Sequence, residues 1–237
     1  MPSLRSICFV PVLVVATLSC AAAAILAGVL DRRRRWALGI VPFWSRLLLV
    51  GGGVQVRLCG ETAELRRGPA VFVANHQSYL DIPVLSSLLP QRSLWLAKRE
   101  LFAIPVFGQG MRAVGQIPVD RGNREVARAS IEAAAGEVAG GFSVTIFPEG
   151  TRSADGTLRP FKLGFAHLAV ASGAPVVPLV LRGTGLLWPK GAWGTRPGAV
   201  EVTVLRSLLP PQSGDADALR CFAEQVRAAM LAAVEER

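Results

Sequence analysis

The sequence contains few of the residues on which metal sites and disulfide frameworks depend. Its 237 residues include only four cysteines and two histidines, and no two cysteines form a Cys-x-x-Cys pair. Cys8 and Cys20 both lie within an apolar stretch. These absences exclude the common zinc-binding patterns and leave no basis for a disulfide framework. We therefore expect no metal and no disulfide, and a reducing compartment.

Acidic and aromatic residues are also scarce. The chain has 17 Asp and Glu residues against 26 Lys and Arg, which gives a net charge of +9 at pH 7. Such an excess favours an anionic partner: a nucleic acid, an anionic membrane surface or a phosphate-bearing substrate. Aromatic residues are only 7% of the chain, and no zinc-finger, RNA-recognition or basic-zipper pattern occurs. We therefore expect no nucleic-acid partner.

The longest apolar run lies near the N-terminus. Residues 7–30 contain no charged side chain, and at 1.5 Å per helical residue this length crosses a hydrocarbon core of about 30 Å. Residues 32–35, which follow almost directly, are all arginine. Because positive residues flank the cytoplasmic end of a span, the sequence predicts a transmembrane helix. The rest of the chain is then on the cytoplasmic side, close to the anionic membrane surface.

Two alternatives concern this region. The small residues at 20–24 are compatible with a cleaved signal peptide, although the apolar run is longer than an ordinary signal core. A second apolar segment, residues 36–50, is interrupted by Pro42 and Arg46, which predicts a helix lying in the membrane interface. The alternative for this segment is a second complete span. Three glycines at 51–53 then indicate a hinge.

Strand and helix patterns alternate through residues 54–237, which we expect to form an α/β domain behind a membrane anchor at residues 1–53. Short runs rich in valine and isoleucine predict buried strands, and longer segments predict helices. Such alternation is typical of a largely parallel sheet flanked by helices. The predicted strands are 55–58, 70–74, 94–97, 115–119, 143–147, 176–182 and 200–205, and the predicted helices are 81–89, 106–113, 125–139, 162–172 and 216–235.

His76 and Asp81 form the first candidate site. His76 follows an apolar strand, and Asp81 begins the next helix, with either Ser78 or Asp81 as the capping residue. The turn between them can fold the carboxylate back onto one imidazole nitrogen, and the partly positive helix end favours the ionised acid. An imidazole oriented in this way is a general base for a bound hydroxyl. A core histidine beside a helix-capping aspartate is the alternative interpretation.

A second polar group, the sequence Glu-Gly-Thr-Arg, follows the strand predicted at 143–147. Gly150 permits a tight turn, and Thr151 offers a hydroxyl. Arg152 can bind a phosphate through two nitrogens. Glu149 can bond a substrate hydroxyl or hold Arg152 in place. Both candidate groups follow strands, and in open α/β sheets ligands bind at the carboxyl ends of the strands.

Further basic residues lie between these two groups. Lys98 directly follows a predicted strand and can add a cation to the same pocket, and Arg121 is a further candidate for binding substrate phosphate. The other arginines of this region are expected to be ordinary surface charges, namely Arg99, Arg112, Arg124 and Arg128.

These blocks appear in the order seen in the glycerolipid acyltransferases, and the sequence resembles the 1-acyl-sn-glycerol-3-phosphate acyltransferases over roughly residues 55–210. The resemblance implies that His76 and Asp81 are the catalytic pair. It also implies that the block at 149–152 binds the glycerol-phosphate acceptor, with Lys98 on the phosphate. His167 lies in a stretch often seen in the family, and we interpret it as a packing residue.

The activity that the resemblance implies is transfer of an acyl chain to the sn-2 hydroxyl of lysophosphatidic acid, in phospholipid biosynthesis at a membrane. The donor is acyl-CoA or acyl carrier protein, and no cofactor or metal takes part. No Gly-x-Ser-x-Gly elbow occurs, so we expect direct transfer without an acyl-enzyme. Two alternatives stay open: another lysolipid acceptor, such as lyso-ornithine lipid, and a non-enzymatic protein that binds anionic lipid.

Overall fold

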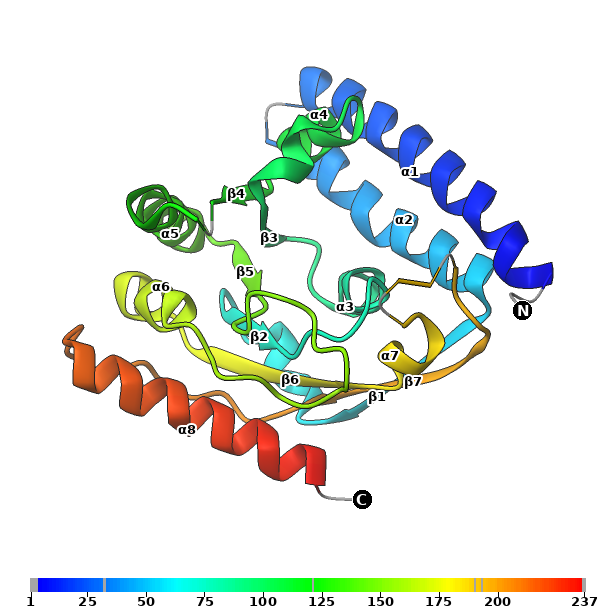
Figure 1. Cartoon of the computed structure of the whole chain (residues 1–237). Coiled ribbons are helices and arrows are strands. Elements are labelled where there is room, and N and C mark those ends of the chain that lie inside the picture. The colour runs from blue at the N-terminus through cyan, green and yellow to red at the C-terminus, as the bar shows by residue number, and fades with distance from the viewer. Residues whose placement is uncertain (1–3, 32, 121, 190, 193, 236–237) are drawn as a thin grey trace.

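Seven strands form one sheet in the computed structural model (Figure 1), which describes residues 4–31, 33–120, 122–189, 191–192 and 194–235. The strand order is β1-β7-β6-β2-β5-β3-β4, and every neighbouring pair is parallel except β6 and β7. The largely parallel sheet predicted from the sequence is therefore confirmed. The strands are β1 (Val54–Gly60), β2 (Val71–Ala74), β3 (Ser93–Lys98), β4 (Ile117–Val119), β5 (Ser143–Ile146), β6 (Val176–Arg182) and β7 (Gly198–Val204).

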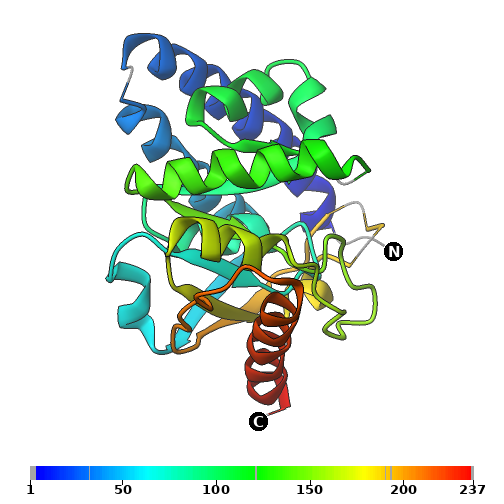
Figure 2. The same ribbon diagram turned by 90° about the vertical axis from the view of Figure 1, so that its left-hand side faces the viewer.

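Helices cover both faces of this sheet. On one face α5, α6 and α8 lie side by side (Figure 2), and their apolar side chains join those of the strands in one buried cluster. On the other face α2 and α3 cover a second cluster, built around Phe72, Leu85 and Trp95. The helices are α1 (Leu4–Leu30), α2 (Arg35–Gly52), α3 (Asp81–Leu88), α4 (Phe107–Val114), α5 (Arg124–Ala139), α6 (Gly164–Ser172), α7 (Thr184–Leu187) and α8 (Ala216–Glu235), with 3-10 helices η1 (Thr62–Arg66) and η2 (Arg99–Ala103).

β2 lies in the middle of the sheet and is buried on both faces. All four of its residues are buried, and it pairs with β5 on one side and β6 on the other. A strand covered on both faces is apolar at successive positions instead of alternating, because each side chain meets a helix layer. This strand places the following residue, Asn75, and then His76 at the carboxyl edge of the sheet, where the strand β5 also ends.

The N-terminal helices pack against the α/β domain. Phe9, near the start of α1, meets the Trp188 ring at 5.4 Å, and Gly28, near its end, lies so close to α4 that an added Cβ would be 3.0 Å from Ala113 Cβ. Both ends of α1 therefore contact the domain. The part of α1 from Phe9 to Leu30 has a mean hydropathy of 2.5, and by length and composition it is able to cross a membrane.

The second apolar segment is a helix, as predicted, and its place in the membrane interface stays a prediction. α2 runs without interruption through Pro42 and Arg46, and it packs against α1 and α3. Two of the three glycines predicted as a hinge, Gly51 and Gly52, belong to this helix. Only Gly53 leaves it, with a positive φ of 65° that ends the helix.

Candidate active site

His76 and Asp81 meet in the loop between β2 and α3. The imidazole Nδ1 lies 2.7 Å from Asp81 Oδ2, and the backbone N–H groups of Gln77 and Ser78 donate to the same oxygen at 2.7 and 2.8 Å. Asp81 is 0% exposed and the His76 side chain 14%. An ionised carboxylate only accepts, so Nδ1 donates its proton and Nε2 is left as the basic nitrogen. The contact predicted from the spacing is present.

The contacts of the predicted Ser78 cap are present, including its Ser-x-x-Asp box. The Ser78 hydroxyl accepts from the Leu80 N–H at 3.1 Å, and the Asp81 carboxylate accepts the Ser78 N–H at 2.8 Å. The regular helix begins at Asp81, so Asp81 itself is not the capping residue, and the Ser78 hydroxyl also donates to the Trp188 carbonyl at 2.8 Å. The Asp81 carboxylate lies at the N-terminal end of the helix, where unpaired backbone N–H groups carry partial positive charge.

The His76 ring is held in a fixed plane by Phe147, the residue that directly follows β5. It stacks on Phe147 with the ring centroids 4.0 Å apart and an interplanar angle of 8°, and Trp95 of β3 packs behind Phe147 at 5.3 Å. The Asp81 bond fixes one edge of the imidazole and Phe147 covers one face. The direction of Nε2 is therefore set by Phe147, directly after β5, together with Asp81 of α3.

Glu149 braces the loop that carries the histidine. Its Oε1 accepts the backbone N–H of His76 at 2.7 Å, and its Oε2 accepts that of Arg159 at 3.2 Å. Burial raises the pKa of the Glu149 carboxyl, and the two backbone N–H groups partly oppose this shift. The Ser153 N–H also donates to the His76 carbonyl at 2.8 Å. The strand-following segment at 147–153 thus holds the His76 backbone.

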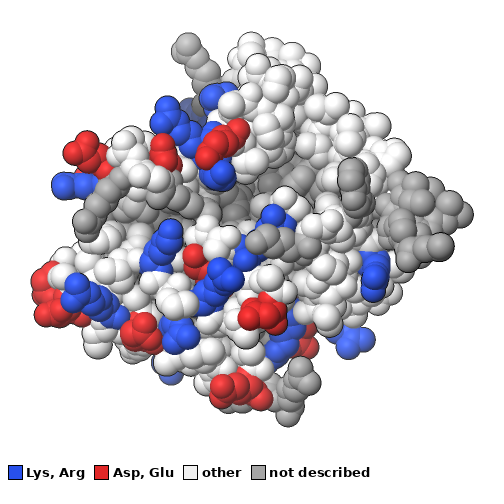
Figure 3. Space-filling model, in the orientation of Figure 1, with Lys and Arg blue, Asp and Glu red and all other residues white. Residues whose placement is uncertain are grey.

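Arg152 lies flat over an aromatic ring. Its guanidinium carbon is 3.7 Å from the centroid of Tyr79, and within the described part of the chain its buried Nη1 has no hydrogen-bond partner. Gly150 makes the preceding turn with a positive φ of 72°, and the Lys162 stem lies over it, 3.0 Å from where a Cβ would stand. Thr151 is exposed. Figure 3 shows Lys and Arg side chains gathered around the hollowed middle of this face.

Lys98 ends β3 and forms an ion pair with Glu100 at 2.9 Å, and both side chains are exposed. The Lys98 ammonium holds the pKa of the Glu100 carboxyl below its usual range. Arg121 lies outside the described residues. His167 is exposed on α6, so its interpretation as a packing residue is wrong.

The arginines expected at the surface are mostly found there. Arg99 pairs with Asp120 at 3.4 Å, Arg128 pairs with Glu132 at 2.9 Å, and both arginines are well exposed. Arg112 lies over the Phe102 ring at 5.7 Å. The side chain of the fourth, Arg124, is not among those described.

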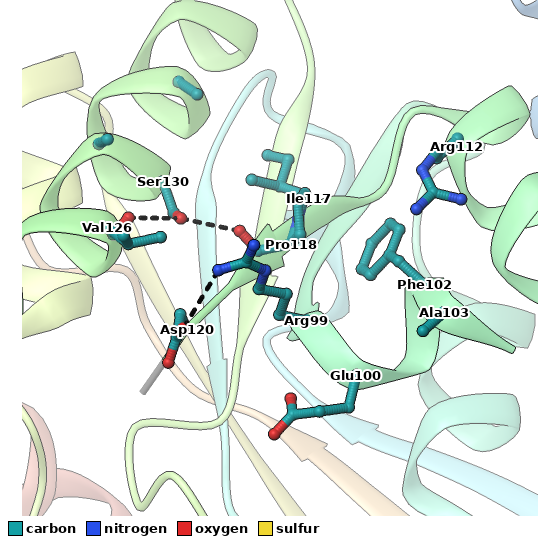
Figure 4. Close-up of a pocket in the computed structure, with 12 residues that line it drawn as sticks. Arg99, Glu100, Phe102, Ala103, Arg112, Ile117, Pro118, Asp120, Val126 and Ser130 are labelled. Carbon is teal, nitrogen blue, oxygen red and sulfur yellow. Dashed lines mark hydrogen bonds and ion pairs between the residues drawn. The ribbon is translucent and has the colours of Figure 1, made fainter. Parts of the chain in front are cut away.

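A separate cavity of about 1020 Å³ lies beside the edge strand β4, between η2, α4 and α5. Figure 4 shows the Arg99–Asp120 ion pair across its middle, with Phe102 and Arg112 on one side and Ser130 on the other. His76, Asp81, Glu149 and Arg152 are not among the residues that line it. This cavity is therefore distinct from the site of His76 and Asp81.

A sequence model of the acyltransferase family matches residues 55–182, a range that includes both candidate groups. This chain belongs to the acyltransferase family. A 1-acyl-sn-glycerol-3-phosphate acyltransferase of Cocos nucifera is 40% identical over 143 residues, which cover 60% of this chain and 46% of the relative. One from Limnanthes douglasii is 38% identical over 164 residues, covering 69% and 56%. The chain spans about half the length of these curated relatives.

A solved structure of this acyltransferase family agrees in fold over nearly the whole chain. The 1-acyl-sn-glycerophosphate (LPA) acyltransferase PlsC from Thermotoga maritima superposes with a TM-score of 0.79 at 25% identity, covering 99% of this chain and 97% of that one. Within the described part of this acyltransferase chain, no group of three or more His, Cys, Asp or Glu side chains could hold a metal ion. We continue to predict that the reaction uses neither metal nor cofactor.

Sequence reasoning missed the two aromatic residues beside the site, Tyr79 and Trp188. Tyr79 is the one tyrosine of the chain and stands between Ser78 and Asp81, so its place in the motif was a usable signal. Trp188 lies more than a hundred residues further on, in the segment after α7, and no local pattern connects it with the histidine loop.

Proposed function

We propose that this acyltransferase is a 1-acyl-sn-glycerol-3-phosphate O-acyltransferase. It transfers an acyl chain from acyl-CoA or acyl carrier protein to the sn-2 hydroxyl of lysophosphatidic acid and forms phosphatidic acid for phospholipid biosynthesis. The observation that carries the proposal is the bond of 2.7 Å between His76 Nδ1 and Asp81 Oδ2. It leaves Nε2 as a base, in a loop that the Glu-Gly-Thr-Arg segment braces. The names of the similar proteins support this acceptor.

In the proposed reaction His76 Nε2 takes the proton of the sn-2 hydroxyl as its oxygen attacks the thioester carbonyl. The resulting tetrahedral oxyanion collapses, the carbon–sulfur bond breaks, and the thiolate leaves with the proton returned by the imidazolium. Asp81 stabilises that imidazolium and fixes its orientation. A positioned general base of this kind contributes about 10²–10⁴ in rate. No protein nucleophile is needed, because the acceptor itself supplies the attacking oxygen.

The acceptor phosphate is proposed to lie against the segment at 149–152. Arg152 supplies a guanidinium, Gly150 makes the turn that presents it, and Thr151 offers an exposed hydroxyl. Glu149 acts on the acceptor through the histidine loop, since backbone N–H groups occupy both its oxygens. Lys98 and Arg121 are proposed as further cations for the phosphate, with Lys98 released from Glu100 when an anion binds.

The enzyme is proposed to work on a membrane surface, where a lysophospholipid is found. α1 and α2 expose large apolar side chains that suit the acyl region, and arginines follow α1 at the turn into α2. We place the α/β domain on the cytoplasmic side of a bacterial inner membrane, with residues 1–53 as its anchor. The donor, acyl-CoA or acyl carrier protein, then reaches the site from the aqueous phase.

The test is acyl transfer by the purified protein to radiolabelled lysophosphatidic acid, with acyl-CoA and acyl carrier protein as alternative donors. Wild-type protein is expected to form phosphatidic acid, and His76→Ala is expected to lose about 10²–10⁴ in rate. A melting curve shows whether the variant is folded. If product formed from lyso-ornithine lipid and not from lysophosphatidic acid, the proposed acceptor would be wrong. If the protein bound lipid but formed no product with any donor, and if His76→Ala bound lipid equally well, the proposed enzymatic function would be wrong.

A further inference from the structure

A row of rings runs from α1 to the guanidinium of Arg152. Phe9 meets Trp188 edge to face at 5.4 Å and 89°, and Trp188 packs on Tyr79 at 5.5 Å and 54°. Tyr79 in turn lies under Arg152, 3.7 Å from ring centroid to guanidinium carbon. The four side chains come from α1, the segment after α7, the histidine loop and the segment after β5. They therefore join the N-terminal helix to the proposed phosphate-binding residue.

The inner members of this row are fixed by hydrogen bonds. The Trp188 indole N–H donates to the Ala192 carbonyl at 2.9 Å, and the Trp188 carbonyl accepts the Ser78 hydroxyl at 2.8 Å. Trp188 is buried, as is Phe9, whereas half of the Tyr79 surface is exposed. A rigid tryptophan thus supports one side of a tyrosine ring whose other neighbour is a cation.

Arg152 is placed by this ring and lacks an acceptor at one of its nitrogens. Arginine side chains are flexible, and a guanidinium stacked on an aromatic face loses that freedom before a ligand arrives. Its Nη1 is buried without a hydrogen-bond partner in the described residues, which is uncommon for a native polar group. An anionic oxygen that entered beside the guanidinium would satisfy it through a charge-assisted bond.

We propose that Tyr79 is a positioning residue for the acyl acceptor: its ring holds Arg152 in the orientation that binds the anionic headgroup, and Trp188 and Phe9 hold the ring. The inference rests on the proposed function and adds a role for three aromatic residues, Tyr79, Trp188 and Phe9. The proposal also makes α1 part of the acceptor site, because Phe9 of α1 contacts Trp188 at the outer end of the row.

The experiment compares Tyr79→Leu, which removes the ring face, with Tyr79→Phe, which keeps it. Tyr79→Leu is expected to raise the KM for lysophosphatidic acid about threefold to thirtyfold, the range that a cation–π contact supports. Its kcat and the KM for the acyl donor should stay within about twofold of wild type, as should every constant of Tyr79→Phe. In an Arg152→Ala background, Tyr79→Leu should add nothing further. An undiminished effect in that background would overturn the proposal.

The outer part of the row is tested by Phe9→Leu, with Phe222→Leu as the matched control. Phe222 is a buried phenylalanine of α8 that packs on Phe165 of α6 and is not part of the row. Both variants are expected to lower the melting temperature, but only Phe9→Leu should raise the KM for lysophosphatidic acid. Equal KM values in the two variants would remove Phe9 from the proposal.

A binding measurement separates this inference from the proposed function. The dissociation constant of short-chain lysophosphatidic acid is measured by calorimetry without donor, and it should weaken in Tyr79→Leu but not in Tyr79→Phe. A wild-type protein that acylates this lipid while Tyr79→Leu binds it normally would overturn the inference alone. A wild-type protein that neither binds nor acylates it would overturn both.

Discussion

The two oxygens of Asp81 have very different surroundings. Oδ2 accepts from His76 Nδ1 and from two backbone N–H groups, whereas Oδ1 is buried with no partner in the described part of the chain. Oδ2 alone therefore orients the His76 imidazole. An amide that keeps its carbonyl at the Oδ2 position would preserve these three bonds and remove only the charge.

Asp81→Asn is accordingly expected to stay folded and lose activity. The imidazole remains oriented, but the imidazolium formed during proton transfer loses its counter-charge, so kcat should fall by about 10²–10⁴. The variant buries an NH₂ at the unpartnered Oδ1 position, at a cost of about 1–3 kcal/mol in the free energy of unfolding. Steady-state kinetics and denaturant unfolding measure the two effects. Asp217→Asn, at an exposed position on α8, is the control, and a kcat equal to that control would contradict the role of Asp81.

Glu149→Gln tests the brace behind the histidine. Each carboxylate oxygen accepts a backbone N–H, so in the amide one NH₂ must face a donor. We expect a loss of about 1–3 kcal/mol in the free energy of unfolding and a lower kcat, because the His76 loop is no longer fixed. If Glu149 served only as a substrate ligand, the free energy of unfolding would instead match that of wild type.

The pH dependence of that loss has a definite sign. Burial raises the pKa of Glu149 above its ordinary value of 4.5, so the folded state holds this proton more tightly than the unfolded state. The contribution of Glu149 to stability is complete below pH 4.5 and falls as pH rises through the raised folded pKa. Glutamine does not titrate, so the difference in free energy of unfolding between wild type and Glu149→Gln should become smaller as pH rises. Denaturant unfolding of both proteins at a series of pH values from 4.5 upward measures this difference. A difference that grew with pH would contradict a raised pKa at Glu149.

At the scale of the elements, α1 and α4 pack closely against each other at a glycine of α4. A Cβ added to Gly110 would lie 2.8 Å from Ala21 Cβ and 2.9 Å from its Cα, which real contacts do not allow. Gly110→Leu should therefore push α1 off α4 and lower the free energy of unfolding by about 1–3 kcal/mol. Gly136→Leu on α5 meets nothing within 4 Å and should be neutral or stabilising by up to about 1 kcal/mol. Chemical denaturation compares the two, and equal losses would refute close packing of α1.

Most elements of the α/β domain follow from apolar periodicity, and the exceptions have physical causes. β7 lies antiparallel to β6, a direction that a run of buried valines does not encode. The short helices η1 and α7 have too few residues for a recognisable period.

In the site, too, contacts within one turn were predictable from the sequence, and contacts between distant segments were not. The contact of His76 with Asp81 was predictable because both residues lie in one short turn. The contact of Tyr79 with Arg152 joins two loops far apart in sequence, and stacking of a cation on a ring leaves no pattern of spacing. The contacts of Glu149 were not predictable either, since its partners are backbone groups that carry no sequence signal.

Across the whole molecule, charge and apolar surface are separated. In Figure 3 the charged side chains lie over the α/β domain, and the region of α1 and α2 is almost free of them. Val15, Leu26 and Val29 of α1 are 63%, 61% and 74% exposed. They are spaced by about three and four helical turns, which places them on one face. On α2 the exposed large side chains are Trp36, Phe43, Leu47 and Val50.

This apolar face predicts where the acyltransferase meets a bilayer. Val15→Glu combined with Leu26→Glu should reduce co-sedimentation with phosphatidylglycerol-containing vesicles at least tenfold, because each charge must be removed from water or held away from the lipid. Leu209→Glu, at a position 79% exposed in the segment before α8, is the matched control and should sediment like wild type. Transfer to a short-chain acceptor dispersed in detergent should persist in the double variant, since neither substituted residue contributes to the His76 loop. Unchanged sedimentation of the double variant would show that another surface holds the protein on the membrane.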